Sequence, residues 1–345
     1  RSIGAYRFSA DSKRVYALTD HLGQHPLWSI ALDDGARKML MQSGNVAEFD
    51  VARDRIVFTM QGVSAPADLH VIGGNAAPRR LTDINASRLV DVSFKGWNDE
   101  TVHGYVMKPA SFVAGTKYPV AFIVHGGPQS SFANTWSYRW NPQVYSGAGY
   151  GVVFIDFHGS TGYGQAFTDS ISGDWGGKPL EDLQKGLAAA LGQYDWLDGD
   201  RACALGASYG GYMINWIAGN WPDRFRCLVN HAGLFDHRSM YYSTEELWFP
   251  EWDHGGPYHD NPAAHEQSNP ANHVLAWKTP MLVIHGALDY RVPYSQGLAT
   301  FTALQRRGIE SRFLYFPDEN HWISKPANSL QWHAEVLGWL DRHLK

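Results

Sequence analysis

Residues 205–213 read LGASYGGYM and place Ser208 at the centre of a G-x-S-x-G pattern. An apolar stretch, ACALGA (202–207), precedes the serine, and a stretch of helical composition, GYMINWIAGN (211–220), follows it. A strand that turns abruptly into a helix needs small residues on both sides of the turn, because bulky neighbours would clash. Such a turn holds the serine hydroxyl at the carboxyl edge of a sheet, beside free N–H groups of the helix. The pattern therefore predicts a nucleophilic serine rather than a plain glycine-rich turn.

Apolar and helical stretches alternate along the chain from about residue 89 onward. Continuous apolar stretches are typical of strands that are buried on both faces of a parallel sheet. They lie at 120–127, 150–159, 202–208, 227–233, 280–289 and 311–316, and the helical stretches lie at 180–193, 211–220, 295–308 and 329–345. Residues 90–99 and 101–109 also predict an antiparallel pair of strands around a polar turn. The alternation predicts an α/β fold with a mostly parallel sheet flanked by helices.

The first 88 residues have a different organisation. DSKRVYALTD (11–20) and ARDRIVFTMQ (52–61) begin 41 residues apart, as do LWSIALDDG (27–35) and DLHVIGGN (68–75). Short β-rich stretches with this period indicate blades of a β-propeller. Two blades cannot close a ring, so we expect earlier blades outside this chain, in the same protein or in a separate fragment. The predicted domains are an incomplete propeller at 1–88 and a catalytic domain at 89–345.

Composition narrows the classes of function. The 345 residues are 44% hydrophobic and 18% charged, with a formal net charge of -5 and no block of Lys or Arg, which argues against a nucleic-acid partner. No stretch approaches the ~18 apolar residues of a membrane-spanning helix. The chain starts without Met or a signal peptide, which we interpret as a piece of a larger protein. Both cysteines, Cys203 and Cys227, lie in apolar stretches, and we expect buried free thiols rather than a disulfide.

A nucleophilic serine needs a general base and an acid that orients it. In α/β-hydrolases these follow the serine in the order acid, then histidine. The stretch VIHGALDYRVP (283–293) carries Asp289, and the loop PDENHW (317–322) carries His321, each after a predicted strand. Because functional groups gather at the carboxyl edge of such a sheet, Ser208, Asp289 and His321 are the predicted triad.

Other acids and histidines are weaker candidates for these roles. Asp318 lies close to the predicted base in sequence, but its loop position indicates a turn-capping role. Asp236 follows the preceding strand and stays open as an alternative acid. His285 lies inside a buried strand and is expected to be a hydrogen-bonded core histidine, while His333 and His343 fit packing or surface positions on the last helix.

An oxyanion intermediate needs two N–H donors aimed at it. Tyr209, the residue after the predicted nucleophile, supplies one. The glycine-rich strand end HGGPQ (125–129) is the candidate for the second, against the alternative of a simple strand-ending turn.

No metal or cofactor pattern stands out in the sequence. The histidines of HGGPYH (254–259) and HEQSNPANH (265–273) do not form a helical i,i+4 ligand pair with a base. CxxC pairs and a GxxxxGK[ST] loop are also absent from the sequence. We therefore expect neither a metal nor a cofactor.

Several of these motifs, taken in order, resemble the prolyl-oligopeptidase family of serine peptidases. The branch is similar to the acylaminoacyl-peptidases and dipeptidyl-peptidase 5. The resemblance spans residues 89–345 and depends on HGGPQ (125–129), GSTGYG (159–164), GDWGG (173–177), GASYGGYM (206–213), HGALDYRVP (285–293) and DENHW (318–322). NHAGLFD (230–236) and STEELWFPEW (243–252) are most like the dipeptidyl-peptidase 5 group. The resemblance implies an α/β-hydrolase fold preceded by a propeller.

The resemblance also implies roles for single residues. The nucleophile, acid, general base and two oxyanion N–H groups would be Ser208, Asp289, His321, Gly127 and Tyr209. Arg291 matches an arginine that binds the carbonyl of the second residue on the amino side of the cut, although by itself it could be a surface cation. Val292 matches a wall of the pocket for the residue at the cut.

A dipeptidyl-peptidase must also hold the free amino group of its substrate. The stretch STEELWFPEWD (243–253) offers Glu245, Glu246 and Glu251 among aromatic residues. Glu245 or Glu246 is the candidate anchor, because a buried cation needs a carboxylate partner. The alternative is a helix start in which Ser243 and Glu246 form a capping box.

We therefore expect a serine exopeptidase that releases dipeptides from unblocked N-termini and prefers an apolar or small residue at the cut. An acylaminoacyl-peptidase or oligopeptidase of the same family is the alternative, and an esterase or a non-catalytic propeller adaptor is more distant. The expected partners are short peptides and the remaining propeller blades, without nucleic acid or membrane, and a homodimer is possible. The resemblance suggests a periplasmic or secreted location.

Overall fold

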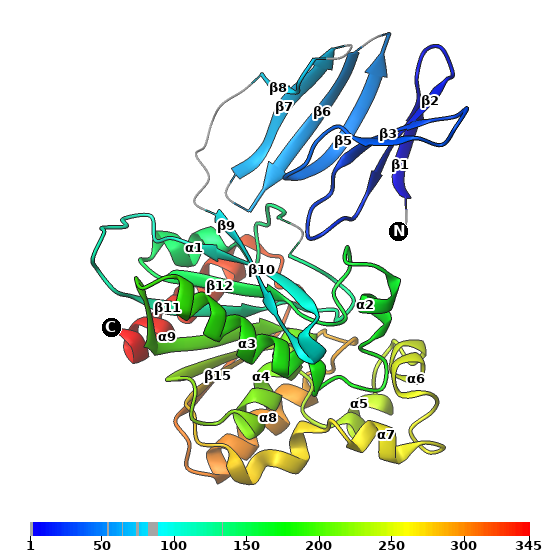
Figure 1. Cartoon of the computed structure of the whole chain (residues 1–345). Coiled ribbons are helices and arrows are strands. Elements are labelled where there is room, and N and C mark those ends of the chain that lie inside the picture. The colour runs from blue at the N-terminus through cyan, green and yellow to red at the C-terminus, as the bar shows by residue number, and fades with distance from the viewer. Residues whose placement is uncertain (1–2, 54, 64, 74–75, 82–88, 133) are drawn as a thin grey trace. The chain divides into compact units, whose positions relative to one another are not determined.

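Figure 1 shows a computed structural model of the chain, which describes residues 3–53, 55–63, 65–73, 76–81, 89–132 and 134–345. The chain forms two compact units. The first unit comprises Arg1–Val90, Ser131–Val144 and Ser160–Thr168, and the second comprises Asp91–Ser130, Tyr145–Gly159 and Asp169–Lys345. The boundary predicted at residue 88 lies outside the described residues.

The first unit contains two four-stranded antiparallel sheets, coloured blue in Figure 1. One contains β1 (Ile3–Phe8), β2 (Arg14–Thr19), β3 (Leu27–Ala31) and β4 (Arg37–Met39), and the other contains β5 (Asn45–Ala52), β6 (Arg55–Gly62), β7 (Ala65–Gly73) and β8 (Arg79–Arg80). Strands β2 and β6 begin at residues 14 and 55, so the 41-residue spacing of the sequence corresponds to the repeat from sheet to sheet. A cluster of apolar side chains fills the core of the unit: Leu18, Leu27, Val46, Phe49, Ile56, Phe58 and Ile72.

An eight-stranded mixed sheet forms the centre of the second unit. Its order is β16-β15-β14-β13-β11-β12-β10-β9. The bounds are β9 (Leu89–Lys95), β10 (Thr101–Met107), β11 (Tyr118–Val124), β12 (Gly151–Asp156), β13 (Leu197–Ala207), β14 (Cys227–His231), β15 (Met281–Gly286) and β16 (Ser311–Phe316). Strands β11 to β16 pair in parallel, whereas β10 pairs antiparallel with β12. The predicted hairpin is present as the neighbouring strands β9 and β10, with the short helix η1 (Trp97–Asp99) between them.

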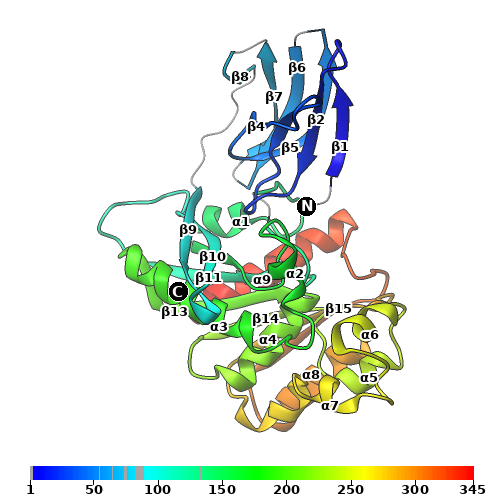
Figure 2. The same ribbon diagram turned by 45° about the vertical axis from the view of Figure 1, so that its right-hand side comes forward.

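The longer helices pack on the mixed sheet, and shorter helices lie in the segments between strands along the chain. Their bounds are α1 (Pro142–Gly147), α2 (Gln165–Asp169), α3 (Lys178–Gln193), α4 (Tyr209–Asn220), α5 (His237–Tyr241), α6 (Trp248–His254), α7 (Pro262–Glu266), η2 (Pro270–Ala276), α8 (Ser295–Arg306) and α9 (Pro326–Leu344). Helix α4 packs on β11, β13 and β14, α8 packs on β15 and β16, and α9 packs on β13 and β14. An α/β arrangement with these helices on a mixed sheet is consistent with an α/β-hydrolase. Figure 2 shows that α5, α6 and α7 gather beside one end of this sheet.

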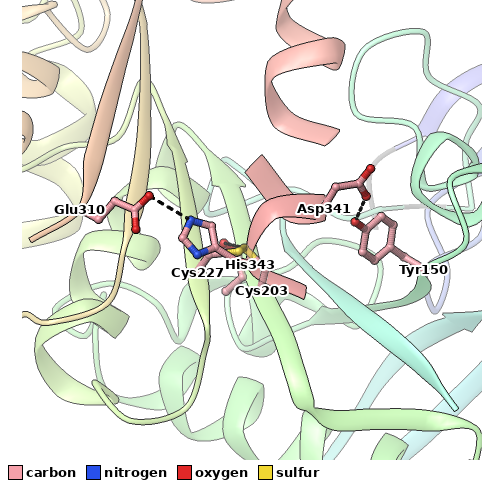
Figure 3. The surroundings of a disulfide bond; sticks show 7 residues. Tyr150, Cys203, Cys227, Glu310, Asp341 and His343 are labelled. Atoms are coloured by element: carbon pink, nitrogen blue, oxygen red, sulfur yellow. Dashed lines mark hydrogen bonds and ion pairs between the residues drawn. A yellow bond between two sulfur atoms is a disulfide. The ribbon is translucent and has the colours of Figure 1, made fainter. Parts of the chain in front are cut away.

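The two cysteines form a disulfide, so the expectation of free thiols is wrong. Cys203 on β13 and Cys227 on β14 are direct partners in the parallel pair, with Cα atoms 4.7 Å apart. That separation is within the range of disulfide-bonded cysteines. Figure 3 shows the bond near α9, where His343 lies 3.9 Å from Glu310. Two isolated apolar stretches could not reveal this pairing, because strand order and register decide it.

Among the helices of the described residues, none is long and apolar enough to cross a membrane.

Candidate active site

Ser208 lies on a tight turn between β13 and α4. Its backbone has φ 60° and ψ -122°, which is a strained conformation for a residue with a side chain. A Cβ added at Gly206 would overlap the backbone of Gly210, and one added at Gly210 would overlap the carbonyl of Val124. Both positions therefore require glycine. The Ser208 N–H donates to the carbonyl of His231 at 3.0 Å, which fixes the turn against the end of β14.

Asp289 and His321 form a hydrogen-bonded pair at the same edge of the sheet. His321 Nδ1 lies 2.6 Å from Asp289 Oδ2, and the two residues are 8% and 2% exposed. Asp289 follows β15 and His321 follows β16, which are parallel neighbours. The loops are also joined directly, because the Leu288 N–H donates to the carbonyl of Glu319 at 2.9 Å. A carboxylate only accepts, so Nδ1 of His321 carries a proton and Nε2 is left as the ring's acceptor.

The carboxylate of Asp289 is held in its ionised form. Burial alone would raise the pKa of Asp289, but hydrogen bonds from His285 and His321 outweigh it and the pKa is lowered. Its Oδ1 also accepts the N–H groups of Arg291 and Val292 at 3.1 and 2.9 Å. These contacts fix the carboxylate and keep it charged beside the imidazole.

The alternative acids are engaged elsewhere. Asp318 is half-exposed and binds Lys325 at 2.5 Å and Asn328 at 3.1 Å. Asp236 is the N-cap of α5 and accepts the Ser239 N–H at 2.9 Å.

The surroundings of His285 match a core histidine. The side chain is fully buried, and its Nε2 lies 2.7 Å from the carbonyl of Val292. It therefore supports the loop that carries Asp289. His333 binds the carbonyl of Ser329 within its own helix, and His343 lies beside the disulfide.

The glycine-rich loop after β11 approaches the serine closely. A Cβ added at Gly126 would lie 3.3 Å from Ser208 Cβ and 3.9 Å from its Oγ. The next residue, Gly127, has φ 123°, a conformation that favours glycine. Tyr209 follows the serine as the first residue of α4 and is 3% exposed. The segment that contains Gly127 therefore passes close to Ser208, and Tyr209 is its neighbour in the chain; their oxyanion role stays a prediction.

Arg291 and Glu246 form an ion pair. The guanidinium Nη2 lies 3.0 Å from Glu246 Oε1, and the cation stacks over the ring of Trp322 at 5.4 Å. Backbone contacts tie the two segments together, because the N–H of Glu245 donates to the carbonyl of Tyr290 at 2.9 Å. Glu246 is thus the partner of Arg291, whereas Glu245 is exposed.

The segment before α6 differs from what the sequence predicts. The capping box of Ser243 and Glu246 is wrong: α6 begins only at Trp248, and Ser243 Oγ instead donates to the carbonyl of Ser239 at 2.6 Å. A two-residue match of polar types was too weak to place a helix start. Val292 is 5% exposed, so its side chain is mostly covered by protein.

A buried carboxylate, that of Asp253, connects segments around the serine turn and has no sequence signal of its own. Asp253, 1% exposed, accepts from Trp175 Nε1 at 2.8 Å and from Gln129 Nε2 at 3.0 Å. The carbonyl of Trp175 in turn accepts the hydroxyl of Tyr209 at 2.6 Å. Asp253 thereby joins the glycine-rich loop to the residue after the serine. The motifs HGGPQ and GDWGG signal two of these positions, but nothing in the sequence marks Asp253 as their partner.

Glu319 performs a similar supporting role for the histidine loop. Its carboxylate is buried and accepts the N–H groups of Ser324 and Lys325, both at 2.9 Å. Glu319 therefore ties the residues before His321 to those after it, which fixes the loop that carries the imidazole. In the sequence, Glu319 is marked only by its place in the motif DENHW (318–322).

A serine on a strained strand–helix turn, together with an Asp–His pair after later strands of the same parallel sheet, defines the α/β-hydrolase class. Comparison with known families gives the more specific assignment. Residues 136–345 match the model of the prolyl oligopeptidase family, and the chain belongs to that family of serine peptidases.

Curated relatives of this chain carry the name dipeptidyl-peptidase 5. The Schizosaccharomyces pombe protein is 50% identical over 74% of this chain and 38% of its own length. The Porphyromonas gingivalis protein is 37% identical over 100% of this chain and 52% of its own length. The chain thus spans about half the length, or less, of the curated relatives it matches. Among solved structures, Pyrococcus horikoshii acylaminoacyl peptidase has a TM-score of 0.87 at 24% identity, covering 100% of this chain and 56% of that protein, which supports the fold.

Proposed function

We propose that this chain carries the catalytic domain of a serine exopeptidase, with Ser208 as nucleophile, His321 as general base and Asp289 as the orienting acid. The observation that carries the proposal is the 2.6 Å bond between His321 Nδ1 and Asp289 Oδ2 at the sheet edge where Ser208 follows β13. This bond leaves Nε2 of the imidazole as the proton acceptor for the serine hydroxyl.

The reaction proceeds through an acyl-enzyme. Ser208 Oγ attacks the carbonyl of the scissile bond while Nε2 of His321 takes its proton. The N–H groups of Gly127 and Tyr209 bind the developing oxyanion. His321 then gives this proton to the departing amine. In the second half, water attacks the acyl carbonyl while Nε2 of His321 takes its proton, and His321 returns a proton to Ser208 Oγ as the acid leaves.

The Arg291 side chain is the proposed contact for the carbonyl of the second residue on the amino side of the cut. Its ion pair with Glu246 at 3.0 Å and its stacking on Trp322 hold the guanidinium in one place. Two of the five N–H donors of an arginine suffice for one carboxylate, so others stay available to a substrate carbonyl. Val292 follows as a wall of the neighbouring pocket.

Release of dipeptides requires an anchor for the free amino group two residues from the cut. Glu246 is held by Arg291, and Glu245 is the exposed carboxylate next to it. We assign the amine to this pair of acids, with Glu245 as the acid that has no ion pair among those found in the described residues. The name dipeptidyl-peptidase 5 of the curated relatives agrees with this specificity.

The two four-stranded sheets of the first unit are proposed to be the last blades of a propeller whose other blades lie outside this chain. Their 41-residue repeat and their antiparallel order support this assignment. The remaining blades and short peptides are then the partners of this chain.

The specificity is tested with two chromogenic dipeptide substrates that differ only in an N-terminal acetyl group. The full-length polypeptide that contains this chain is assayed with each. Faster hydrolysis of the free dipeptide supports the dipeptidyl activity. Hydrolysis of the acetylated substrate alone would make the enzyme an acylaminoacyl-peptidase, and hydrolysis of simple esters without any peptide would make it an esterase.

A further inference from the structure

Three buried histidines come together in the chain segment that connects β14 to β15. His237 is the first residue of α5, His254 is the last residue of α6, and His265 lies in α7. Their exposures are 3%, 3% and 0%. One ring nitrogen from each lies within 4.8 Å of those of the other two. Figures 1 and 2 both show the three short helices gathered in one group.

Several ring nitrogens in this cluster have no hydrogen-bond partner among the described residues. They are Nε2 of His237, both nitrogens of His254 and Nδ1 of His265. Buried polar atoms are nearly always paired, so a group of unpaired nitrogens that face one another calls for a ligand. Imidazole nitrogens present lone pairs to a shared point, which is the donor set that transition metals prefer.

The outer contacts of the cluster orient the imidazoles as metal ligands. His265 Nε2 lies 3.1 Å from the carbonyl of Gly256. A carbonyl only accepts, so Nε2 holds the proton and the unpaired Nδ1 carries the lone pair. His237 is hydrogen-bonded to the backbone of Ser268, which leaves its Nε2 as the unpaired nitrogen. Metal-ligating histidines usually make this kind of bond with their second nitrogen.

The three imidazoles are almost completely covered by protein and shielded from water. Aromatic rings close the surroundings: Trp175 lies 5.0 Å from His254, and Tyr258 lies 5.3 Å from His265, between ring centroids.

We propose that His237, His254 and His265 bind one divalent transition-metal ion, with zinc as the best fit to three neutral imidazoles. Zn–N bonds of about 2.0–2.1 Å in a tetrahedral site place the nitrogens ~3.3 Å apart. The rings must therefore draw together from their present spacing of up to 4.8 Å. Each ring lies on a different short helix, so small shifts of α5, α6 and α7 suffice. Water takes the fourth position, because among the described residues only the three histidines form this group of candidate ligands.

The metal would act as a structural cross-link. It joins three helices of five to seven residues in the chain segment that connects β14 to β15. Helices of this length are too short to be stable alone. This role is independent of the proposed peptidase activity. A plain packing role for the three histidines is the competing explanation, and in that case the chain binds no metal tightly.

The test uses the 345-residue chain without a histidine tag, stripped with a chelator and then titrated with Zn²⁺ and with Co²⁺. We expect one metal per chain, a Co²⁺ absorption spectrum typical of tetrahedral coordination, and a higher melting temperature with Zn²⁺. His254→Gln and His265→Gln should each weaken Zn²⁺ binding by more than roughly 100-fold, beyond the loss caused by an outer contact. His259→Gln is the matched control, because this neighbouring histidine is 61% exposed and should bind as before.

X-ray absorption of the Zn²⁺ complex of the unaltered chain gives a second measurement that does not depend on how a variant folds. Three imidazole nitrogens at about 2.0–2.1 Å support the site. The proposal is overturned if the stripped chain binds no Zn²⁺ when the metal is in about 100-fold molar excess over the chain. It is equally overturned if His259→Gln weakens binding as much as His254→Gln, or if the bound zinc has fewer than three imidazole ligands.

Discussion

Replacing Asp289 by asparagine should remove almost all catalysis while leaving most of the fold intact. In the structure, Asp289 Oδ2 accepts the proton on His321 Nδ1 at 2.6 Å. An asparagine NH₂ at this place faces Nδ1 as a second donor, so the imidazole changes to the tautomer with its proton on Nε2. That tautomer cannot take a proton from the serine hydroxyl.

The size of the effect follows from this change of tautomer. Loss of the correct tautomer costs about 10⁴ in kcat, or ~5.5 kcal/mol of transition-state stabilisation. The loop should persist, because the amide oxygen can still accept the N–H groups of Arg291 and Val292. We expect a loss of about 1–2 kcal/mol in the free energy of unfolding, since a charge-assisted hydrogen bond is replaced by a neutral one.

The assay compares kcat for a chromogenic dipeptide across three asparagine variants of the full-length polypeptide, with urea unfolding of each. Asp318→Asn and Asp236→Asn are the controls, because both acids were rival candidates and both bind groups away from His321. Each should keep kcat within about threefold, which is below ~0.7 kcal/mol. A loss in either control as large as that in Asp289→Asn, or a variant Asp289→Asn with more than a tenth of the original kcat, would refute the reasoning.

Three further predictions concern the fold around the site. Gly211→Ala should lower the free energy of unfolding by about 3 kcal/mol, because the added Cβ would lie 2.6 Å from a backbone Cα of the loop after β14, and chemical denaturation measures it. Without reductant, the unfolded chain should show no thiol that reacts with Ellman's reagent, and two free thiols would contradict the disulfide. Reduction of the bond between Cys203 and Cys227, which are 24 residues apart in sequence, should lower the free energy of unfolding by about 3 kcal/mol. Burial would lower the pKa of His158, but Asp182 and Glu100 outweigh it and raise that pKa. His158 therefore stabilises the fold fully below its unfolded pKa of about 6.5, and this contribution fades as the pH rises through the folded pKa. The difference in unfolding free energy between the native chain and His158→Gln should shrink from pH 6 to pH 9, and a difference that grows would be contrary to this assignment.

The strands and long helices of the second unit could be predicted because each has a strong local signal. The apolar stretch at 120–127 covers most of β11, the stretch at 280–289 contains β15, and the helical stretch at 295–308 contains α8. The position of Ser208 on a turn also followed from the sequence, since the close approach of Gly206 to the backbone of Gly210 is a local property of the chain.

Contacts between distant segments could not be predicted in the same way. The disulfide depends on the register of β13 and β14, which brings Cys203 opposite Cys227. The three-histidine cluster has spacings of 17 and 11 residues, from 237 to 254 and from 254 to 265, which match no helical or strand period. Asp253 likewise finds its partners only through the fold.

The most direct test of the proposed triad is to label the chain with a fluorophosphonate and to locate the adduct by peptide mass spectrometry. The account predicts one adduct, on Ser208, because a fluorophosphonate reacts only with a serine that an adjacent base activates. Labelling should be lost in Ser208→Ala and strongly slowed in His321→Gln, and it should persist in the control His333→Gln. An adduct on another serine, or labelling of Ser208 that is unchanged in His321→Gln, would contradict the account.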